Sequence, residues 1–140
     1  MKALTLWQPW ASLVAIEAKK IETRSWYTSY RGPLAIHAAK TKKSLGLFME
    51  DPFLDALVSA GYMLTTLPFG VIVATCNLTS VIRITDTNAS RLSSNEISFG
   101  DYTPGRFAWM LDDIEPFESP VPVRGHQGLW NWKPTQMASE

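Results

Sequence analysis

Glu17-Ala-Lys-Lys-Ile-Glu-Thr-Arg-Ser-Trp26 is the stretch of sequence from which the fold of this chain is inferred. It places charges of both signs between an apolar N-terminal segment and a second apolar run, Gly32-Pro-Leu-Ala-Ile-His-Ala38. Side chains alternate between the two faces of a strand, so one face of a strand here carries Glu22, Arg24 and Trp26. Charged residues held between two core-forming segments indicate a polar site rather than a solvated tail.

Composition bounds the class of protein. A length of 140 residues predicts one domain, residues 1–140, and 46% hydrophobic with 19% charged residues is typical of a globular protein. No apolar run approaches the roughly 20 residues of a membrane span, so we expect no membrane association. The lone Cys76 predicts a buried inert thiol in a reducing, cytoplasmic setting. Two His and one Cys give no zinc signature, and we expect no metal and no cofactor.

Charge is distributed unevenly along the chain. Residues 1–43 hold eight Lys and Arg against two acidic residues, a net charge of +6, and residues 44–140 hold five against eleven, a net charge of −6. One interpretation is a basic face that receives anions such as phosphates. The alternative is that the two halves interleave in space and neutralise each other.

Hydrophobic periodicity predicts two helices among five or six strands. The expected helices cover residues 9–18 and 51–61, and the expected strands cover residues 2–7, 20–26, 34–38, 70–85, 106–111 and 121–124. The polar residues 86–101 predict a long surface loop. Pro116, Pro120 and Pro122 are expected to limit strand pairing around the last segment. The pattern favours an α+β fold, a small barrel covered by helices.

The charged stretch also resembles a family signature, Gly-x-Lys-x-x-Glu-x-Arg, which appears here as Glu17-Ala-Lys19-Lys-Ile-Glu22-Thr-Arg24. Matching flanks are Gln8-Pro-Trp-Ala11, Trp26, Tyr30-Arg-Gly-Pro33, Ile36-His-Ala38, Phe99-Gly-Asp-Tyr102, Gly105-Arg-Phe-Ala-Trp109 and Arg124-Gly-x-Gln-Gly-Leu-Trp-Asn-Trp132. The chain is therefore similar to the ASCH (activating-signal-cointegrator homology) domain of the PUA-like superfamily, in its small stand-alone prokaryotic or phage type. The resemblance implies a small PUA-like β-barrel with flanking helices over the whole chain.

The chain departs from the signature at Glu17, where the family has Gly. A Gly there would allow a positive φ at the helix exit. Glu17 therefore predicts either a different turn or a strained one.

The resemblance implies a cleft near the signature that binds RNA, a nucleotide or a modified base. One branch of the family hydrolyses N4-acetylcytidine with a Lys, a Thr and a Glu and without metal, and another member is a ribonuclease. Lys19 matches that Lys, Glu22 stands in place of the Thr, and Glu96 is the candidate for the Glu. A Glu cannot be activated as a hydroxyl nucleophile, although it can act as a general base.

Each candidate in the signature has a structural alternative. Lys19 binds a phosphate or carbonyl oxygen, or it serves the carbonyl end of the preceding helix. Glu22 accepts hydrogen bonds from a base edge, or it pairs with Lys19 or Arg24. Arg24 forms a forked pair with a phosphate, or it holds Glu22 in place.

Candidates outside these three residues complete the predicted site. Lys20 joins the basic set, and Arg31 is either a phosphate ligand or a residue that stabilises its turn. Trp26 stacks on a base or belongs to the core. His37 is interpreted as a core histidine satisfied by hydrogen bonds, and His126 as exposed.

We therefore expect a binding module whose cleft, built on Lys19, Lys20, Glu22, Arg24, Trp26 and Arg31, takes RNA or a nucleotide-like ligand, with DNA as a further candidate. The alternative is a small metal-free hydrolase that acts on N4-acetylcytidine or on RNA, with Lys19, Glu22 and Glu96 as catalytic residues. The residues predict no oligomeric state.

Overall fold

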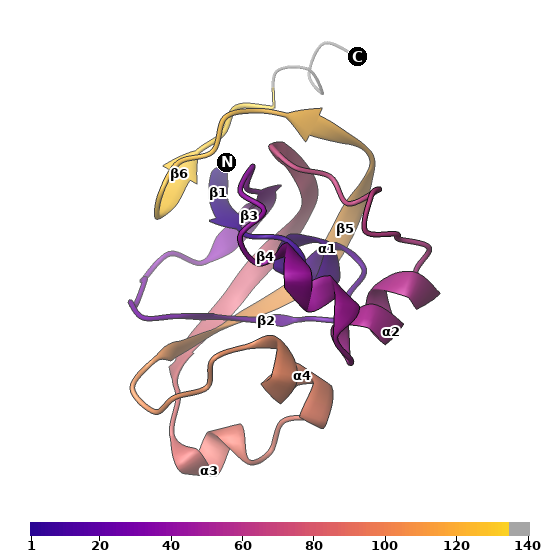
Figure 1. Ribbon diagram of the computed structural model, residues 1–140. Coiled ribbons are helices and arrows are strands. Elements are labelled where there is room, and N and C mark those ends of the chain that lie inside the picture. Colours follow the sequence, from indigo (N-terminus) through magenta and orange to yellow (C-terminus); the bar gives the residue numbers. More distant parts are fainter. Residues whose placement is uncertain (135–140) are drawn as a thin grey trace.

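The computed structural model describes residues 1–134 of the chain. Its strands form one mixed sheet in the order β2-β5-β4-β3-β1-β6 (Figure 1). They are β1 (Lys2–Leu6), β2 (Ile21–Arg24), β3 (Gly32–Ala38), β4 (Val71–Arg83), β5 (Phe107–Pro122) and β6 (Leu129–Asn131). β1 and β3 are parallel, and the other neighbours are antiparallel.

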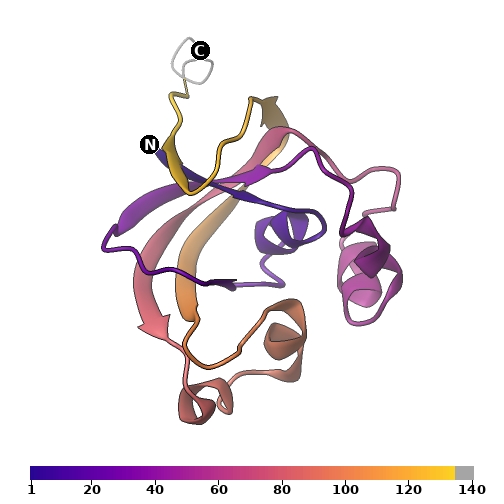
Figure 2. The same cartoon turned by 60° about the vertical axis from the view of Figure 1, so that its left-hand side comes forward.

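The sheet curls around α1 (Trp10–Ala15), which lies within its curve (Figure 2). Irregular register between β4 and β5, and between Ile36 and His37 of β3, bends these strands. The 3-10 helix η1 (Leu45–Met49) and α2 (Phe53–Ser59) form a layer beside α1. The predicted α+β fold, a small β-barrel with flanking helices, is confirmed, with the sheet in the form of a curled half-barrel. Of the helices in the described residues, none has the length and apolar character that crossing a bilayer requires.

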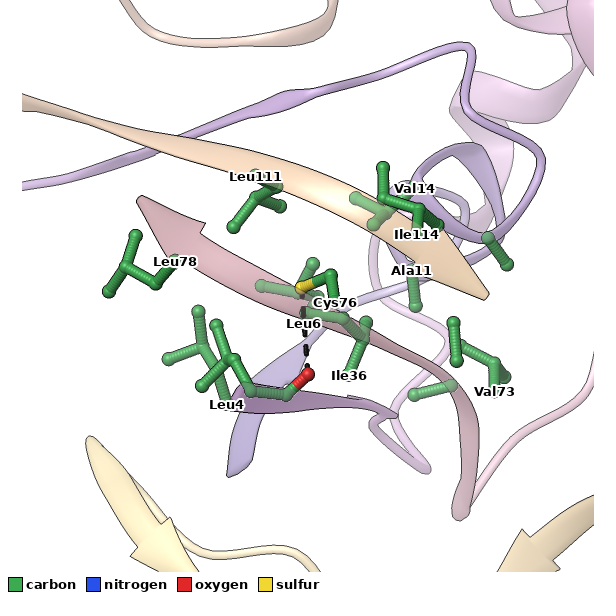
Figure 3. Close-up of a cluster of buried hydrophobic side chains, with 14 of the residues drawn as sticks. Leu4, Leu6, Ala11, Val14, Ile36, Val73, Cys76, Leu78, Leu111 and Ile114 are labelled. Atoms are coloured by element: carbon green, nitrogen blue, oxygen red, sulfur yellow. Dashed lines mark hydrogen bonds between the residues drawn. The ribbon is translucent and has the colours of Figure 1, made fainter. Parts of the chain in front are cut away.

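The main core lies between α1 and the concave side of the sheet. Its buried members include Leu4, Ala11, Val14, Ile36, Val73 and Leu111 (Figure 3). Cys76 belongs to the same cluster, and its Sγ lies 3.5 Å from the carbonyl oxygen of Leu34. Burial raises the pKa of this thiol to about 12. The residue is thus the buried, inert thiol that its sequence context predicts.

β5 continues through the prolines that were expected to limit pairing. It runs to Pro122, and Pro116 is paired with Ala74 of β4. The reason is that β2 pairs with residues 107–110, so the remainder of β5 has a partner strand on the β4 side only, within the described residues. Proline is tolerated on such an edge because its missing N–H can face the unpaired side.

The segment 86–101, expected to be an irregular loop, contains two short helices, so that prediction was wrong in part. They are α3 (Asp86–Ala89) and α4 (Ser94–Phe99), at the far end of β4 (Figure 1). Each begins after a hydroxyl residue whose side chain accepts a backbone hydrogen bond, Thr85 from Asn88 and Ser93 from Glu96. The spacing Ser93-x-x-Glu96 is a helix-start pattern, and it was the sequence signal for α4.

Glu17 adopts a backbone conformation that favours glycine. Its φ is 63°, in the left-handed region, and it lies directly after the C-cap of α1. Its amide donates to the carbonyl oxygen of Val14 at 2.9 Å, which closes the helix end. Of the two predicted alternatives the strained turn is therefore the one observed, since a side chain in this region costs about 1–2 kcal/mol.

Glu17→Gly is expected to raise the free energy of unfolding by about 1 kcal/mol, because glycine adopts this φ without strain but loses more backbone entropy on folding. Urea denaturation measures the change. Glu17→Ala is the matched control, since it removes the charge at the helix end but keeps the strain, and it should stay within about 0.5 kcal/mol of wild type. Equal stabilisation by both variants would show that charge, not backbone strain, is the cause.

Candidate functional site

The charges of the signature form a chain of contacts that starts at a buried lysine. Lys19 is 1% exposed, and its Nζ donates to the carbonyl oxygen of Ile21 at 2.5 Å. The same Nζ lies 3.6 Å from Oε1 of Glu22, whose Oε2 is 3.1 Å from Nε of Arg24. Nη2 of Arg24 donates to the carbonyl oxygen of Thr5 at 2.9 Å. The network thus connects the end of α1, through β2, to β1.

The buried environment of Lys19 disfavours the charged form of its ammonium group. Burial lowers the pKa of its ammonium group, and the carboxylates of Glu22 and Glu96 act in the opposite direction. Its hydrogen bond goes to Ile21, beyond the end of α1, so Lys19 does not serve as a helix cap. Lys19 therefore acts within the protein, where it holds Glu22, and it does not contribute to the wall of either cavity described below.

α4 brings Glu96 to the same network. Oε2 of Glu96 accepts from the backbone amide of Lys20 at 3.2 Å, while its Oε1 is buried without a hydrogen-bond partner among residues 1–134. The hydroxyl of Tyr102 is likewise buried and unpaired. Burial, together with the charges of Glu96 and Glu22, raises the pKa of Tyr102, so this phenol stays protonated at neutral pH. The structure thus gathers Lys19, Glu22 and Arg24 from the β2 region with Glu96 and Tyr102 from the segment after β4.

A cavity of about 410 Å³ opens beside this network. Its aromatic wall is formed by Trp7, Trp10 and Phe99, and its charged side chains are those of Glu22, Arg24, Asp101 and Arg106. Trp7 is 44% exposed, which is unusual for so large an apolar side chain. The cavity therefore offers aromatic surface together with hydrogen-bonding groups of both signs.

The segment after α4 forms one wall of this smaller cavity and is fixed to β2. The amide of Asp101 donates to Oγ1 of Thr23 at 3.1 Å, and Arg106 reaches the carbonyl oxygen of Thr23 at 3.3 Å. A Cβ atom at Gly100 would lie 2.8 Å from the ring of Tyr102, so the backbone approaches too closely for any other residue. The wall is thus held by hydrogen bonds and by a glycine that allows close packing.

A larger cavity, of about 1170 Å³, adjoins the first. The two share Thr5, Trp7 and Arg24 as lining residues. The larger cavity also has Lys40 and Arg124 in its wall, and none of the described residues that line it is acidic. Its walls therefore favour an anionic occupant.

His37 lies at the base of the larger cavity with a defined set of partners. Its Nε2 is 2.8 Å from the carbonyl oxygen of Val123 and therefore carries the proton. Its Nδ1 is 3.2 Å from Oγ1 of Thr5, which in turn accepts from Nε1 of Trp130 at 3.0 Å. All three groups are satisfied when the imidazole is neutral, and burial lowers its pKa. His37 is thus the hydrogen-bonded core histidine that the sequence predicts.

The remaining predicted residues lie apart from the network. Lys20 is exposed and lines neither of these cavities. Arg31 is exposed in its own turn, where it donates to the carbonyl oxygens of Thr28 at 2.8 Å and Tyr30 at 2.7 Å. Trp26 lies just beyond the end of β2 and lines the larger cavity. Its ring packs edge-to-face on the ring of Trp109, with 4.8 Å between the ring centroids.

Several residues that line the two cavities were not predicted from the sequence as site residues. Trp7, Lys40 and Arg106 lie outside the eight-residue signature, and only the fold brings them to its side. Arg106 and Arg124 stand in the matching flanks Gly105-Arg-Phe-Ala-Trp109 and Arg124-Gly-x-Gln-Gly, which were the available signals. Among residues 1–134, no group of three or more His, Cys, Asp or Glu side chains is arranged to hold a metal ion.

The neutral state of His37 predicts a pH-dependent stability. Because its folded-state pKa is depressed below 6.5, its contribution is complete above that pH. As the pH falls below this value the unfolded chain binds the proton first, and stability is lost. Urea denaturation at pH 7 and pH 5 should show a smaller loss in His37→Gln than in wild type. The exposed Arg83→Gln, which lies outside the cavity that His37 lines, is the control and should behave as wild type; an equal loss in all three proteins would contradict the assignment.

Comparison with known proteins identifies a matching family and two relatives of known name. A family model described as the ASCH domain matches residues 4–120. Activating signal cointegrator 1 of Homo sapiens is 51% identical over 41 residues, 29% of this chain and 7% of that protein. The same protein of Mus musculus is 49% identical over 41 residues, with the same coverage of 29% and 7%. The chain therefore matches only a small part of these longer relatives.

Solved structures agree with the fold. The crystal structure of ASCH from Zymomonas mobilis has a TM-score of 0.59 and 15% identity, and covers 98% of this chain and 90% of that chain. A tyrosine-to-phenylalanine mutant of that protein has a TM-score of 0.59 and 16% identity, with coverage of 99% and 96%. At this identity the likeness concerns the fold alone. Because the family model spans most of the chain, this protein belongs to the ASCH domain family.

Proposed function

We propose that this protein binds RNA by holding one nucleotide in the smaller cavity beside Glu22 and Arg24. The observation that carries the proposal is the position of Arg24. Its side chain separates an aromatic cavity from a second cavity whose described lining residues include no acid. A guanidinium in such a position can meet a phosphate while the attached base enters the aromatic side. The general link of the ASCH family to RNA binding supports the same proposal.

The smaller cavity suits a base. Its volume of about 410 Å³ falls within the range of roughly 300–1,000 Å³ of small-molecule sites. Exposed Trp7 and its neighbour Trp10 supply aromatic surface on which a base can stack. Glu22 supplies carboxylate oxygens that can accept from an amino edge, as acidic side chains do with cytosine. In this proposal Lys19 is a positioning residue for Glu22 rather than a ligand contact.

Two features favour binding over hydrolysis. Lys19 is 1% exposed and hydrogen-bonded to Ile21, so its ammonium group does not face a substrate in either cavity. Both oxygens of Glu22 lie close to cations, Oε1 at 3.6 Å from Lys19 and Oε2 at 3.1 Å from Arg24, so the carboxylate is held in a fixed position that suits recognition. Hydrolysis of N4-acetylcytidine remains the alternative function, with Glu96 and its unpaired oxygen as the available base.

The proposal predicts that Arg24→Ala weakens binding of single-stranded RNA. A lost hydrogen bond to a charged group is worth about 1.5–3 kcal/mol, so Kd should rise about ten- to hundredfold. Fluorescence anisotropy with a labelled 10-nucleotide RNA of random sequence, at two salt concentrations, measures this. Arg24→Lys, which keeps the charge but loses the fork, should show a smaller loss.

The control for this experiment is Arg83→Ala, which removes an exposed arginine at the end of β4, away from both cavities. It should bind RNA as wild type does. A matching single-stranded DNA serves as the comparison ligand. If Arg24→Ala and Arg83→Ala bind RNA as tightly as wild type, the cleft assignment fails.

If the protein binds without catalysing hydrolysis, N4-acetylcytidine should stay intact in its presence. The ultraviolet spectrum of N4-acetylcytidine should stay unchanged during incubation with folded protein, because the family threonine is replaced by Glu22. A spectral change that disappears in Glu96→Gln would instead establish the hydrolase function. A change that persists in that variant would place the chemistry elsewhere in the protein.

A further inference from the structure

The larger cavity is bigger than recognition of one nucleotide requires. Its volume of about 1170 Å³ exceeds the range of roughly 300–1,000 Å³ for small-molecule sites. It adjoins the smaller cavity, and Thr5, Trp7 and Arg24 belong to both walls. A ligand that enters the smaller cavity past Arg24 therefore has room to extend into the larger one.

Two of the three cationic side chains in the larger cavity have no acidic partner among the described residues. Lys40 and Arg124 are exposed, and neither forms an ion pair with a carboxylate within residues 1–134. Nε of Arg24 pairs with the carboxylate of Glu22, and its Nη2 donates to the carbonyl oxygen of Thr5. Within the described residues its Nη1 makes no hydrogen bond or ion pair. Three cationic side chains with no acidic neighbour in the wall fit a ligand with more than one negative charge.

Two glycines show that this cavity has defined walls. The stem of Lys40 lies across Gly70, where a Cβ atom would come within 3.0 Å of its Cγ and Cε. Gly70 has a φ of +70°, a conformation that glycine adopts without strain. At Gly125 a Cβ atom would lie 2.5 Å from the ring of His37. The backbone at Gly125 thus approaches the His37 ring more closely than a residue with a Cβ would allow, and at Gly70 a Cβ would displace the stem of Lys40 by a few tenths of an ångström.

We infer that the larger cavity holds the sugar-phosphate backbone of nucleotides adjoining the one bound in the smaller cavity. The ligand is then a single strand of at least two nucleotides and not a free nucleoside or mononucleotide. This inference rests on the proposed function. Arg24 contacts the phosphate between the two cavities, and Lys40 and Arg124 contact the phosphates that follow. Exposed Trp7, at the shared wall, lies where a strand would pass from one cavity to the other.

The inference is tested with random-sequence RNAs of 2, 4 and 10 nucleotides and with an equimolar mixture of the four nucleoside 5′-monophosphates as competitor. Affinity should rise with length. The double variant Lys40→Ala/Arg124→Ala should raise Kd for the 10-nucleotide RNA at least tenfold. It should also lower the salt slope by roughly 1.4, which is two phosphate contacts at about 0.7 each. The concentration of monophosphates needed for half-competition with the dinucleotide should be the same as for wild type.

The matched control is Arg83→Ala/Lys133→Ala, which removes two exposed positive charges outside both cavities. It should bind all RNAs as wild type does, and circular dichroism verifies that every variant is folded. Equal losses in the two double variants would overturn the inference, since net charge would then explain the effect. Wild-type affinity of Lys40→Ala/Arg124→Ala for the 10-nucleotide RNA would overturn it while the proposed function stands. Failure of every RNA and of the monophosphates to bind would instead overturn the proposed function.

Discussion

The buried ammonium group of Lys19 is the constraint on which the site depends. A charge that is 1% exposed is costly to remove from water, by several kcal/mol, unless partners surround it. The carbonyl oxygen of Ile21 and the carboxylate of Glu22 supply them. Glu22 then fixes Arg24, and Arg24 reaches across to Thr5 in β1. The orientation of the one arginine between the two cavities thus follows from a lysine that touches neither.

Close backbone approaches give the cavities their shape. Gly100 lets the backbone after α4 pass close to the ring of Tyr102, and Gly125 lets the segment after β5 lie against His37. At Gly70 the stem of Lys40 crosses the backbone at the start of β4. At Gly100 and Gly125 a Cβ atom would lie 2.8 Å and 2.5 Å from a ring atom, so these close contacts require glycine. The site is therefore a product of packing between segments that are distant in sequence.

Predictions from the sequence were correct where a single strong local pattern determined the structure. The alternation in β2 correctly placed Glu22 and Arg24 on the face opposite Ile21 and Thr23, and the burial pattern follows it. The predictions were wrong where contacts with other elements determined the structure or where the local pattern was weak. α4 was missed because its apolar content is low, although Ser93 is the N-cap that starts it. β5 was predicted too short because a proline is harmful only when both sides of a strand are paired.

The sequence by itself determined the family, the barrel-type α+β fold, the polar strand and the hydrogen-bonded state of His37. These follow from local periodicity and from a signature that occupies consecutive residues. Only the tertiary structure decided the role of each charge, because burial and pairing depend on neighbours from other elements. It moved Lys19 into the interior, held Glu17 at a φ of 63° and brought Lys40 and Arg124 to one cavity from opposite ends of the chain. Distances between side chains arise when the sheet curls, and no pattern along the chain encodes them directly.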